Sequence, residues 1–371
     1  MVETQEVKTK KQQKEFLNFP LELYKNNEFF VPPLYGDEKQ IFKKDYMYYD
    51  QAEAIYFIAR RDGKVVGRIS GILQNAANEK WQRKQVRFTR FDAIDDFEVA
   101  QALFDAVENW AKSKGMEEIV GPLGFSDLER EGLLIEGFDQ LSTFEEQYNF
   151  PYYQKLIESC GYAKDVDWLE HKLSAPEGLD PKIERISSHM MQRYNLHFGT
   201  AKNTKQFLRK YISQIFDVWD ETYDKIYGTV PFTDRMKRNI VQNFKLLIDM
   251  RFVSVVLDET EKVVAFGVCL PSIAKAVQPS HGRLTPGCIV RILRAAKRPE
   301  VIDFAVIGVV DKYKNKAIST ALISKIGTDL VKKIDHAETN LTLEYNAPIN
   351  NLWKLFHSQQ HKRRRCFIKK L

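Results

Sequence analysis

A strand–turn–strand device occurs twice in this chain, and it restricts the fold more than any other feature. The first copy reads RRDGKVVGRISG (60–71) and the second DETEKVVAFGVC (258–269). In each copy a charged turn leads into a β-branched strand that passes through a glycine. The order around each is the same: a hairpin, a further strand, a long helix, then strand, helix and strand. This order predicts an α/β (α+β) chain with a mixed, mostly antiparallel sheet flanked by helices, built twice.

A break near the middle predicts where the two units meet. The stretch LSAPEGLDPK (173–182) has two prolines, one glycine and no hydrophobic periodicity, which is typical of a linker. At 371 residues the chain is also long for a single hydrophobic core. We therefore expect a first domain over residues 1–174, a linker over 175–181 and a second domain over 182–371.

Composition excludes several classes of protein. A chain with 44% hydrophobic and 29% charged residues is globular, and a net charge of +6 does not indicate a nucleic-acid binder. The four cysteines and seven histidines show no metal-ligand spacing, so no metal is predicted. We expect no signal peptide, because the first residues have no apolar core, and no apolar run is long enough to cross a bilayer. We expect a cytoplasmic protein whose oligomeric state the sequence does not indicate.

The stretch VVDKYKNKAIST (309–320) joins a predicted strand around Phe304 to a predicted helix. A helix that begins near Lys316 leaves several backbone N–H groups without partners, and these groups attract an anion together with the helix dipole. Lys314 and Lys316 would add positive charge. The stretch is therefore a candidate phosphate-binding loop.

The same loop lacks the glycines that usually let backbone approach a phosphate closely. Ala317 and Ser319 stand in their places, and both are small. Ser319 and Thr320 could add hydroxyl donors. Taken alone, the residues leave two interpretations open, a phosphate site or an ordinary strand–loop–helix with solvated lysines.

The wider pattern resembles the acetyl-coenzyme A core of the GNAT acyltransferase superfamily. In that superfamily the loop reads Q/R-x-x-G-x-G/A, and its backbone holds the pyrophosphate of coenzyme A. Lys314 stands at the Q/R position, Ala317 at the first glycine and Ser319 at the second. The segments 119–140 and 148–173 extend the resemblance to an uncharacterised bacterial group of tandem GNAT-like proteins.

The resemblance implies an N-acyltransferase that moves an acetyl or longer acyl group from coenzyme A to the amine of a small molecule. Glu344 and Tyr345, at the end of a predicted strand, are candidates for base and acid; the alternative is a strand-end charge and a partly buried tyrosine. The implied coenzyme A contacts are Ile307, Val309, Val310, Lys314, Asn315, Lys316, Ala317, Ile318, Ser319, Thr320 and Asn346.

The chain departs from the family pattern in both halves, and the missing loop glycines and Trp353 of the second half favour a different function. The equivalent first-half region, FDAIDDFEVA (91–100), carries Asp92, Asp95 and Asp96, which would repel a pyrophosphate, so coenzyme A is expected in the second half only. Trp353 occupies the place of the usual general-acid tyrosine. The alternative is a catalytically degenerate GNAT fold that binds a ligand or partner.

Three further segments each allow two interpretations. The basic segment 279–299 is either a solvated amphipathic helix, a lid over an acidic or lipidic substrate, or a contact for a membrane surface. The run HKRRR (361–365) is either a basic turn or a contact for the 3′-phosphate of coenzyme A or an acidic partner. The hydroxyl-rich group at Tyr148, Asn149, Tyr152 and Tyr153 either lines a pocket or is aromatic packing.

Overall fold

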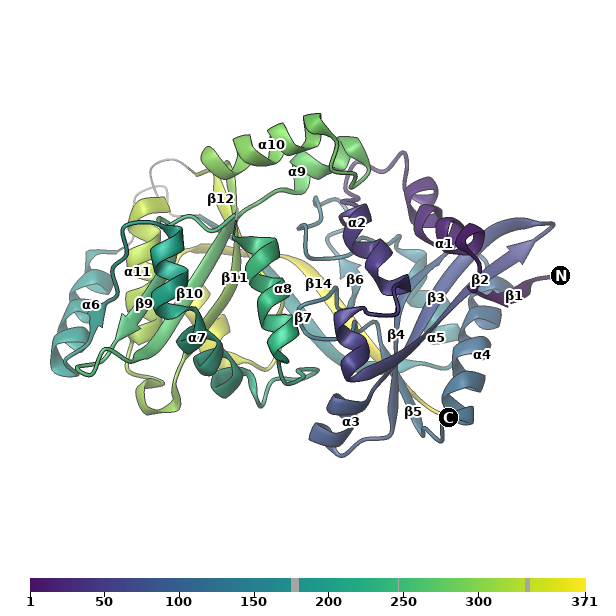
Figure 1. Cartoon of the computed structure of the whole chain (residues 1–371), viewed down its shortest axis with the longest axis horizontal. Helices are drawn as coiled ribbons and strands as arrows, with labels where there is room; N and C mark the ends of the chain where they lie inside the picture. Colours follow the sequence, from purple (N-terminus) through teal and green to yellow (C-terminus); the bar gives the residue numbers. More distant parts are fainter. Residues whose placement is uncertain (175–179, 246, 331–333) are drawn as a thin grey trace.

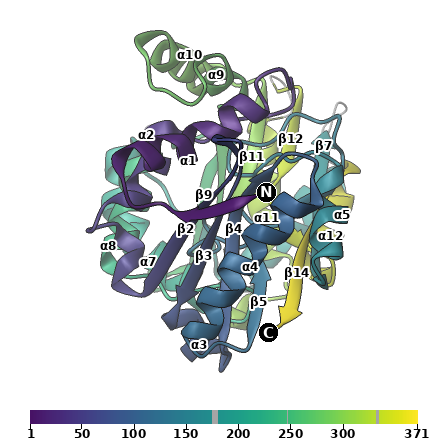
Figure 2. The same cartoon turned by 90° about the vertical axis from the view of Figure 1, so that its right-hand side faces the viewer.

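The computed structural model describes residues 1–174, 180–245, 247–330 and 334–371, and only the backbone within 327–330. Both halves of the chain contribute to one long twisted sheet with helices on its faces (Figures 1 and 2). The first half supplies β1 (Glu3–Glu6), α1 (Lys10–Leu23), α2 (Tyr35–Glu38), β2 (Ala52–Arg61), β3 (Lys64–Gln74), α3 (Asn75–Trp81), β4 (Gln85–Ala93), α4 (Phe97–Ser113), β5 (Glu118–Gly121), β6 (Leu133–Glu136), α5 (Tyr152–Ser159) and β7 (Ala163–Ser174).

The second half repeats this plan with two changes: α6 precedes its first strand, and the pair α9 and α10, at the top of Figure 1, stands where the first half has α3. Its elements are α6 (Pro181–Arg193), β8 (His197–Phe198), α7 (Thr204–Tyr223), α8 (Asp234–Phe244), β9 (Val253–Leu257), β10 (Val263–Pro271), α9 (Ala274–Val277), α10 (Pro286–Lys297), β11 (Val301–Val309), α11 (Ile318–Leu330), β12 (His336–Thr339), β13 (Thr342–Leu343), α12 (Ala347–Leu352) and β14 (His357–Lys370).

The strand order makes the duplication plain. It runs β1-β2-β3-β4-β5-β14-β7-β12-β11-β10-β9-β8, with β6 beside β14 and β13 beside β7. Counted outward from the centre, each first-half strand has a second-half counterpart at the same distance. The pair β4–β5 and its counterpart β11–β12 are parallel, and their neighbours are antiparallel. The predicted fold class, two mixed and mostly antiparallel units flanked by helices, is confirmed.

The two units exchange their central strands. The C-terminal strand β14 lies between β5 and β7 of the first half, and β7 pairs on its other edge with β12 of the second half. The sequence predicted a short last strand inside the second unit. Here β14 instead runs for 14 residues and completes the first-half sheet, so neither sheet is complete without the other half of the chain.

A buried ionic cluster joins these two central strands. Arg364 and Lys362 of β14 are buried, and both reach Glu170 of β7, at 2.6 Å from Arg364 Nε and 3.2 Å from Lys362 Nζ. Lys362 also lies 2.9 Å from Glu338 of β12. The interpretation of 361–365 as a basic turn is therefore wrong, because these residues form the middle of a strand.

Alternation of apolar residues places a helical layer on each face of the sheet. In β9, Val255 packs against α7, while its neighbour Val256 packs in the cluster of α11 on the opposite face. Helix α8 begins with a side-chain cap, because the Thr233 hydroxyl accepts a hydrogen bond from the Met236 amide at 3.2 Å. On one face of the second-half sheet, α7 and α8 line the cavity that is described in the next subsection.

The expected linker falls mainly on 175–179, which lie outside the described residues. On either side of them, Ser174 still pairs with His357 in the sheet, and Asp180 caps α6 by accepting a hydrogen bond from the Lys182 amide at 2.8 Å. The proposed boundaries at 174 and 182 stay predictions. The exchange of β14 means that a cut there would not separate two complete sheets.

Candidate functional site

The parallel strands β11 and β12 part partway along their length. They pair only from Val301 to Phe304 with His336 to Thr339, while β11 continues to Val309. A bulge at Ala305 interrupts the pairing of β11 with β10 and turns the strand. As a result the carbonyls of Phe304 and Ile307 both accept hydrogen bonds on the side away from β10, from the Asn340 amide at 3.1 Å and the Tyr223 hydroxyl at 3.2 Å.

This gap opens into a cavity of about 790 Å³, a volume typical of small-molecule sites. The β11 residues beyond Phe304 form one wall, and the start of α11 lies at one end. A second wall is apolar and comes mostly from α7, α8 and β10; it includes Phe207, Ile212, Phe216, Trp219, Ile240, Phe244, Val268 and Leu270. The first half closes the remaining side with residues 127–129, 131, 145, 146 and 168.

The loop before α11 takes the backbone shape of a glycine-rich loop without containing glycine. A short 3₁₀ turn, Asp311–Tyr313, precedes it, and Asn315 and Ala317 both have positive φ, 59° and 56°, in the region that favours glycine. Among the described residues, the amides of Ser319 and Thr320 have no protein acceptor, as expected for a first helical turn. The loop can therefore present amides to an anion at the cavity.

The two loop lysines take different positions. The Lys314 ammonium lies 2.5 Å from the Asp311 carboxylate, and Lys314 lines the cavity. The Lys316 ammonium instead lies over the ring of Tyr194, 4.6 Å from its centroid, and near Tyr313. Lys314 can reach an anion in the cavity, whereas the cation–π contacts hold Lys316 beside it.

The implied coenzyme A contacts divide into two groups. Ile307, Val309, Lys314, Asn315, Ser319 and Asn346 line the cavity. Val310, Lys316, Ala317, Ile318 and Thr320 do not, and the Ile318 side chain is buried in the cluster beneath α11. The members of the second group could take part only through their backbone.

The candidate base and acid lie away from this cavity. The Glu344 carboxylate lies 2.7 Å from Lys164 Nζ and accepts a hydrogen bond from the Asp167 amide, and Tyr345 is 62% exposed. Neither lines the cavity. Trp353 is buried against Phe304, with ring centroids 5.4 Å apart. These positions agree better with the alternative interpretation, in which Glu344 is a charge at the end of a strand and Tyr345 is a partly buried tyrosine, than with a catalytic acid and base.

Five carboxyl groups from the first half line the cavity, and sequence reasoning missed them. They are Asp127, Glu129, Glu131, Glu145 and Glu146. Burial raises the pKa of Glu131 well above its ordinary value, that of Glu145 to about 7 and that of Glu146 to about 8. Oxygen atoms of Asp127, Glu131 and Glu146 are buried without a hydrogen-bond partner in the described structure. The acidic runs in 127–131 and 145–146 were the only available signal, and such runs usually indicate solvated loops.

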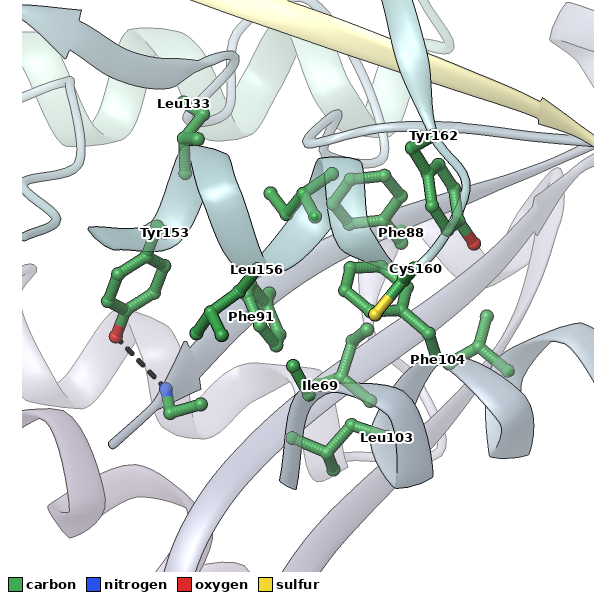
Figure 3. Packing of buried hydrophobic residues seen from close by; sticks show 14 of the residues in the cluster. Ile69, Phe88, Phe91, Leu103, Phe104, Leu133, Tyr153, Leu156, Cys160 and Tyr162 are labelled. Atoms are coloured by element: carbon green, nitrogen blue, oxygen red, sulfur yellow. Dashed lines mark hydrogen bonds between the residues drawn. The ribbon is translucent and has the colours of Figure 1, made fainter. Parts of the chain in front are cut away.

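The corresponding gap in the first half is closed. Strands β4 and β5 also pair only briefly, Gln85 to Arg87 with Glu118 to Val120, but aromatic rings pack beyond that point. Figure 3 shows Tyr153 beside Phe91, with its hydroxyl hydrogen-bonded to the Ala93 amide at 3.0 Å. The second interpretation of the hydroxyl-rich group, aromatic packing, is the one that holds for Tyr153.

The start of α4 is occupied as well. Asp96 caps the helix by accepting a hydrogen bond from the Val99 amide at 3.2 Å, and its carboxylate lies 2.7 Å from Arg61. Asp92 is buried and lies 2.7 Å from Arg68. These carboxylates exclude an anion by occupying the helix start and the strand end, in addition to repelling it.

Comparisons with known proteins agree with this duplicated architecture. No known protein-family model matches the chain. The chain is 27% identical over 368 residues to "Protein YghO" of Escherichia coli, covering 96% of this chain and 93% of that protein. It is 26% identical over 378 residues to "Bacterial ceramide synthase" of Caulobacter vibrioides, covering 98% and 96%.

Two solved structures share the fold over the whole chain. A tandem GNAT protein from the clavulanic acid biosynthesis pathway aligns with a TM-score of 0.56 and 10% identity, covering 100% of this chain and 98% of that one. A GCN5-related glucosamine N-acetyltransferase region of a fungal multi-domain β-N-acetylglucosaminidase aligns with a TM-score of 0.57 and 11% identity, covering 100% of this chain and 38% of that one. The chain therefore has the GNAT acetyltransferase fold in a tandem arrangement.

Proposed function

We propose that the protein is an N-acyltransferase that uses acyl-coenzyme A in the second-half gap and acylates an amine held by the first-half carboxyl groups. The observation that carries this proposal is the shared cavity. The start of α11, the parted strand β11 and five carboxyl groups, of which Glu131 and Glu146 are buried, all contribute to the walls of one space of about 790 Å³. The negatively charged donor would thus lie at the start of α11, and the amine acceptor would lie at the carboxyl groups on the opposite wall of the same cavity.

The donor end is argued from the loop and the strand. The pyrophosphate would lie at the free amides of Ser319 and Thr320, with Lys314 beside it. The two backbone groups of one strand residue point to the same side, so the Ile307 amide faces the gap as its carbonyl does. That amide is suited to hold the thioester carbonyl while negative charge develops on its oxygen.

The acceptor end is argued from the carboxyl groups. An amine would find hydrogen-bond acceptors in Glu131 and Glu146, because each has a buried carboxyl oxygen without a protein donor in the described structure. Glu145 also lines a small recess with Phe304 and Ala305, where β11 and β12 part. With a pKa of about 7, its carboxylate is suited to take a proton from the ammonium form of the acceptor and so free the nitrogen lone pair. The neutral amine then attacks the thioester, the C–N bond forms as the C–S bond breaks, and the second amine proton passes to the leaving thiolate.

The apolar wall suits a hydrocarbon chain on either substrate. Phe207, Phe216 and Trp219 lie along it, and an alkyl chain placed there gains stabilisation from each buried methylene. A ceramide is itself a fatty amide, so the activity named for the Caulobacter relative is also the acylation of an amine. We therefore expect a long acyl-coenzyme A to bind more tightly than acetyl-coenzyme A.

Thermal denaturation with coenzyme A, acetyl-coenzyme A and palmitoyl-coenzyme A tests the donor site. Ligand at about 100 times its Kd stabilises the fold by about 2.7 kcal/mol. Ser319→Asp should abolish this stabilisation because a carboxylate would face the pyrophosphate. Ser213→Asp, on an exposed position of α7, is the matched control and should respond normally. A normal response of Ser319→Asp would refute the placement of the donor.

Turnover on a panel of primary amines, followed by mass spectrometry, tests the acceptor site. Glu145→Gln should lose acyl transfer and keep the coenzyme A response, while Glu344→Gln should retain both. The opposite pattern would move the base to Glu344. A coenzyme A response without transfer to any amine would favour the catalytically degenerate binding protein.

A further inference from the structure

The segment from α9 to α10 carries an apolar surface that the fold does not cover. The side chains of Leu284, Ile289, Val290 and Leu293 are 54%, 45%, 64% and 52% exposed. These four make up half of the large hydrophobic side chains that are exposed in the described part of the chain. Scattered single apolar residues are ordinary on a surface, but a cluster of this kind marks a contact.

Helix α10 is apolar on two sides. Its inner side packs through Cys288, Ile292 and Ala296 on the cluster that covers β10 and β11, so folding already uses one apolar stripe. Ile289, Val290 and Leu293 lie on the outer side. In Figures 1 and 2, α9 and α10 form the outermost layer at the top of the molecule. The outer stripe is therefore available to a large, flat partner.

The charge around this stripe is entirely positive. Residues 274–299 contain six basic residues and no acidic residue: Lys275, Arg283, Arg291, Arg294, Lys297 and Arg298. The whole chain holds 56 basic and 50 acidic residues, so removing these six leaves the remainder balanced. The net positive charge of the protein is thus concentrated on the one segment that also exposes apolar side chains.

The cations of the last turn are not used by the fold. Arg291 donates a hydrogen bond to the Ala276 carbonyl at 2.9 Å, and Lys275 lies 3.8 Å from Glu300. Within the described residues, no carboxylate lies within ion-pair distance of Arg294, Lys297 or Arg298. An exposed apolar stripe flanked by unpaired Arg and Lys has the composition of a helix that lies in the interface of an anionic membrane.

We propose that α10 and the loop before it form a docking surface for the anionic surface of a lipid bilayer. Leu284, Ile289, Val290 and Leu293 would enter the headgroup region, and Arg294, Lys297 and Arg298 would meet lipid phosphates. Phe244, Val268, Leu270 and Ala305 belong both to the cluster under α10 and to the cavity wall. Docking would therefore bring the apolar side of the cavity close to the membrane, although the binding itself does not depend on the acyltransferase proposal.

Co-sedimentation of the full chain with vesicles tests this surface. Vesicles of phosphatidylglycerol and phosphatidylcholine should bind the protein at low salt, and pure phosphatidylcholine vesicles should bind it much less. Binding should fall at 0.5 M NaCl because the lipid charge is then screened. Failure of the wild-type protein to bind the anionic vesicles at low salt would overturn the proposal.

Two sets of variants separate the apolar and the charged contributions. Val290→Asp/Leu293→Asp should reduce binding below detection, while Ile186→Asp, at an equally exposed position of α6, should bind as the wild type does. Arg294→Gln/Lys297→Gln should weaken binding on the order of tenfold or more, since each basic residue near an anionic surface contributes a factor of about five. The charge-matched control is Lys10→Gln/Lys11→Gln on α1.

Circular dichroism and thermal melting must show that each variant is folded. Because the changed side chains are exposed, no loss of stability is expected. Normal vesicle binding by the folded Val290→Asp/Leu293→Asp variant would overturn the proposal. So would sedimentation equilibrium showing a wild-type dimer that this variant abolishes, since the surface would then be an interface between two copies of the chain.

Discussion

The two gaps beside the parallel strand pairs arise from the same arrangement but reach opposite outcomes. In the first half, Tyr153 and Phe91 fill the space beyond the short β4–β5 pairing, and Asp96 occupies the start of the following helix. In the second half, the space beyond the β11–β12 pairing opens into the large cavity, and the helix start presents free amides. Identical backbone plans can therefore carry a packed core or a binding site, depending on a few side chains.

The exchanged strands β7 and β14 couple the stability of the two halves. Breaking the buried ion pair between these strands should therefore have the largest effect on the free energy of unfolding. Arg364→Met removes the guanidinium that lies 2.6 Å from Glu170 and 3.8 Å from Glu146. Breaking a buried ion pair by removing one partner costs about 3–5 kcal/mol. We expect one cooperative loss of stability in urea denaturation, detected both by tryptophan fluorescence and by coenzyme A binding. Loss confined to one half would mean that the exchanged strands do not couple the units.

The hydroxyl groups of Tyr153 and Tyr223 each form a hydrogen bond with the backbone beside one of the two gaps. Removing each hydroxyl therefore compares how tightly the two gaps are packed. Tyr153→Phe should lower the free energy of unfolding by about 1–3 kcal/mol, because its hydroxyl bonds the Tyr24 hydroxyl and the Ala93 amide in a fully buried site. Tyr223→Phe, which loses the bond to the Ile307 carbonyl at the open cavity, should cost about 1 kcal/mol or less. Chemical denaturation measures both. Equal losses would contradict the view that only one gap is packed.

The rate of acyl transfer should rank the same two variants in the opposite order, with the larger change in Tyr223→Phe. Tyr153→Phe should leave acyl transfer unchanged in the folded protein, whereas Tyr223→Phe should alter it because Ile307 lies where the thioester would be held. An unchanged rate for Tyr223→Phe together with a reduced rate for Tyr153→Phe would assign the reaction to the wrong half.

The acids of the two gaps should respond to pH with opposite signs. In the closed half, the Arg61 guanidinium lowers the pKa of Asp96, so its contribution to stability is present above the unfolded value and is lost as pH falls. In the open half, burial raises the pKa of Glu146 to about 8. The folded state then binds more protons than the unfolded state, and stability falls as pH rises from about 4.5 to about 8.

Melting between about pH 2.5 and pH 8.5 checks this sign, because the contribution of Asp96 is lost only as pH falls below its unfolded pKa. Glu146→Gln should flatten the decline on the alkaline side, and Asp96→Asn should flatten the decline on the acid side. Acyl transfer should rise through about pH 7 as Glu145 loses its proton. A profile for Glu146→Gln that parallels the wild type would show that Glu146 is charged in the folded protein.

The smallest effect concerns the loop that only the open half has. Ala317 has a φ of 56°, and a left-handed conformation costs an ordinary residue about 1–2 kcal/mol. Part of this is regained by the lower chain entropy of alanine when unfolded. Ala317→Gly should therefore stabilise the protein by about 0.5–1 kcal/mol and tighten coenzyme A binding, as measured by melting and calorimetry. Destabilisation would mean that the loop relaxes away from this shape.

The sequence was sufficient to predict features that depend on local pattern. The hairpins, the duplicated order and the loop from Lys314 to Ser319 all follow from spacing and turn chemistry. The exchange of β7 and β14 could not be predicted. The strand β7 that pairs with β14 lies about 200 residues earlier in the chain, and the periodicity of a strand does not indicate which other strand it pairs with. Lys362 and Arg364 looked like surface cations for the same reason.

The acceptor side of the site was missed because burial of charge is a property of the assembled fold. Glu131, Glu145 and Glu146 occur in stretches with the composition of solvated loops. Their surroundings come from strands and helices far away in the chain, including Arg364 and the cavity wall. Glu344 was chosen because it follows a strand, but in the structure Lys164 and the Asp167 amide hold its carboxylate.

The central claim is that the second-half gap binds coenzyme A and the first-half gap does not. Isothermal titration calorimetry of the full chain with coenzyme A tests it most directly. The account predicts one site per chain, lost in Ser319→Asp and unchanged in Tyr153→Phe. Two sites per chain, no binding at millimolar ligand, or a single site that survives Ser319→Asp would contradict it.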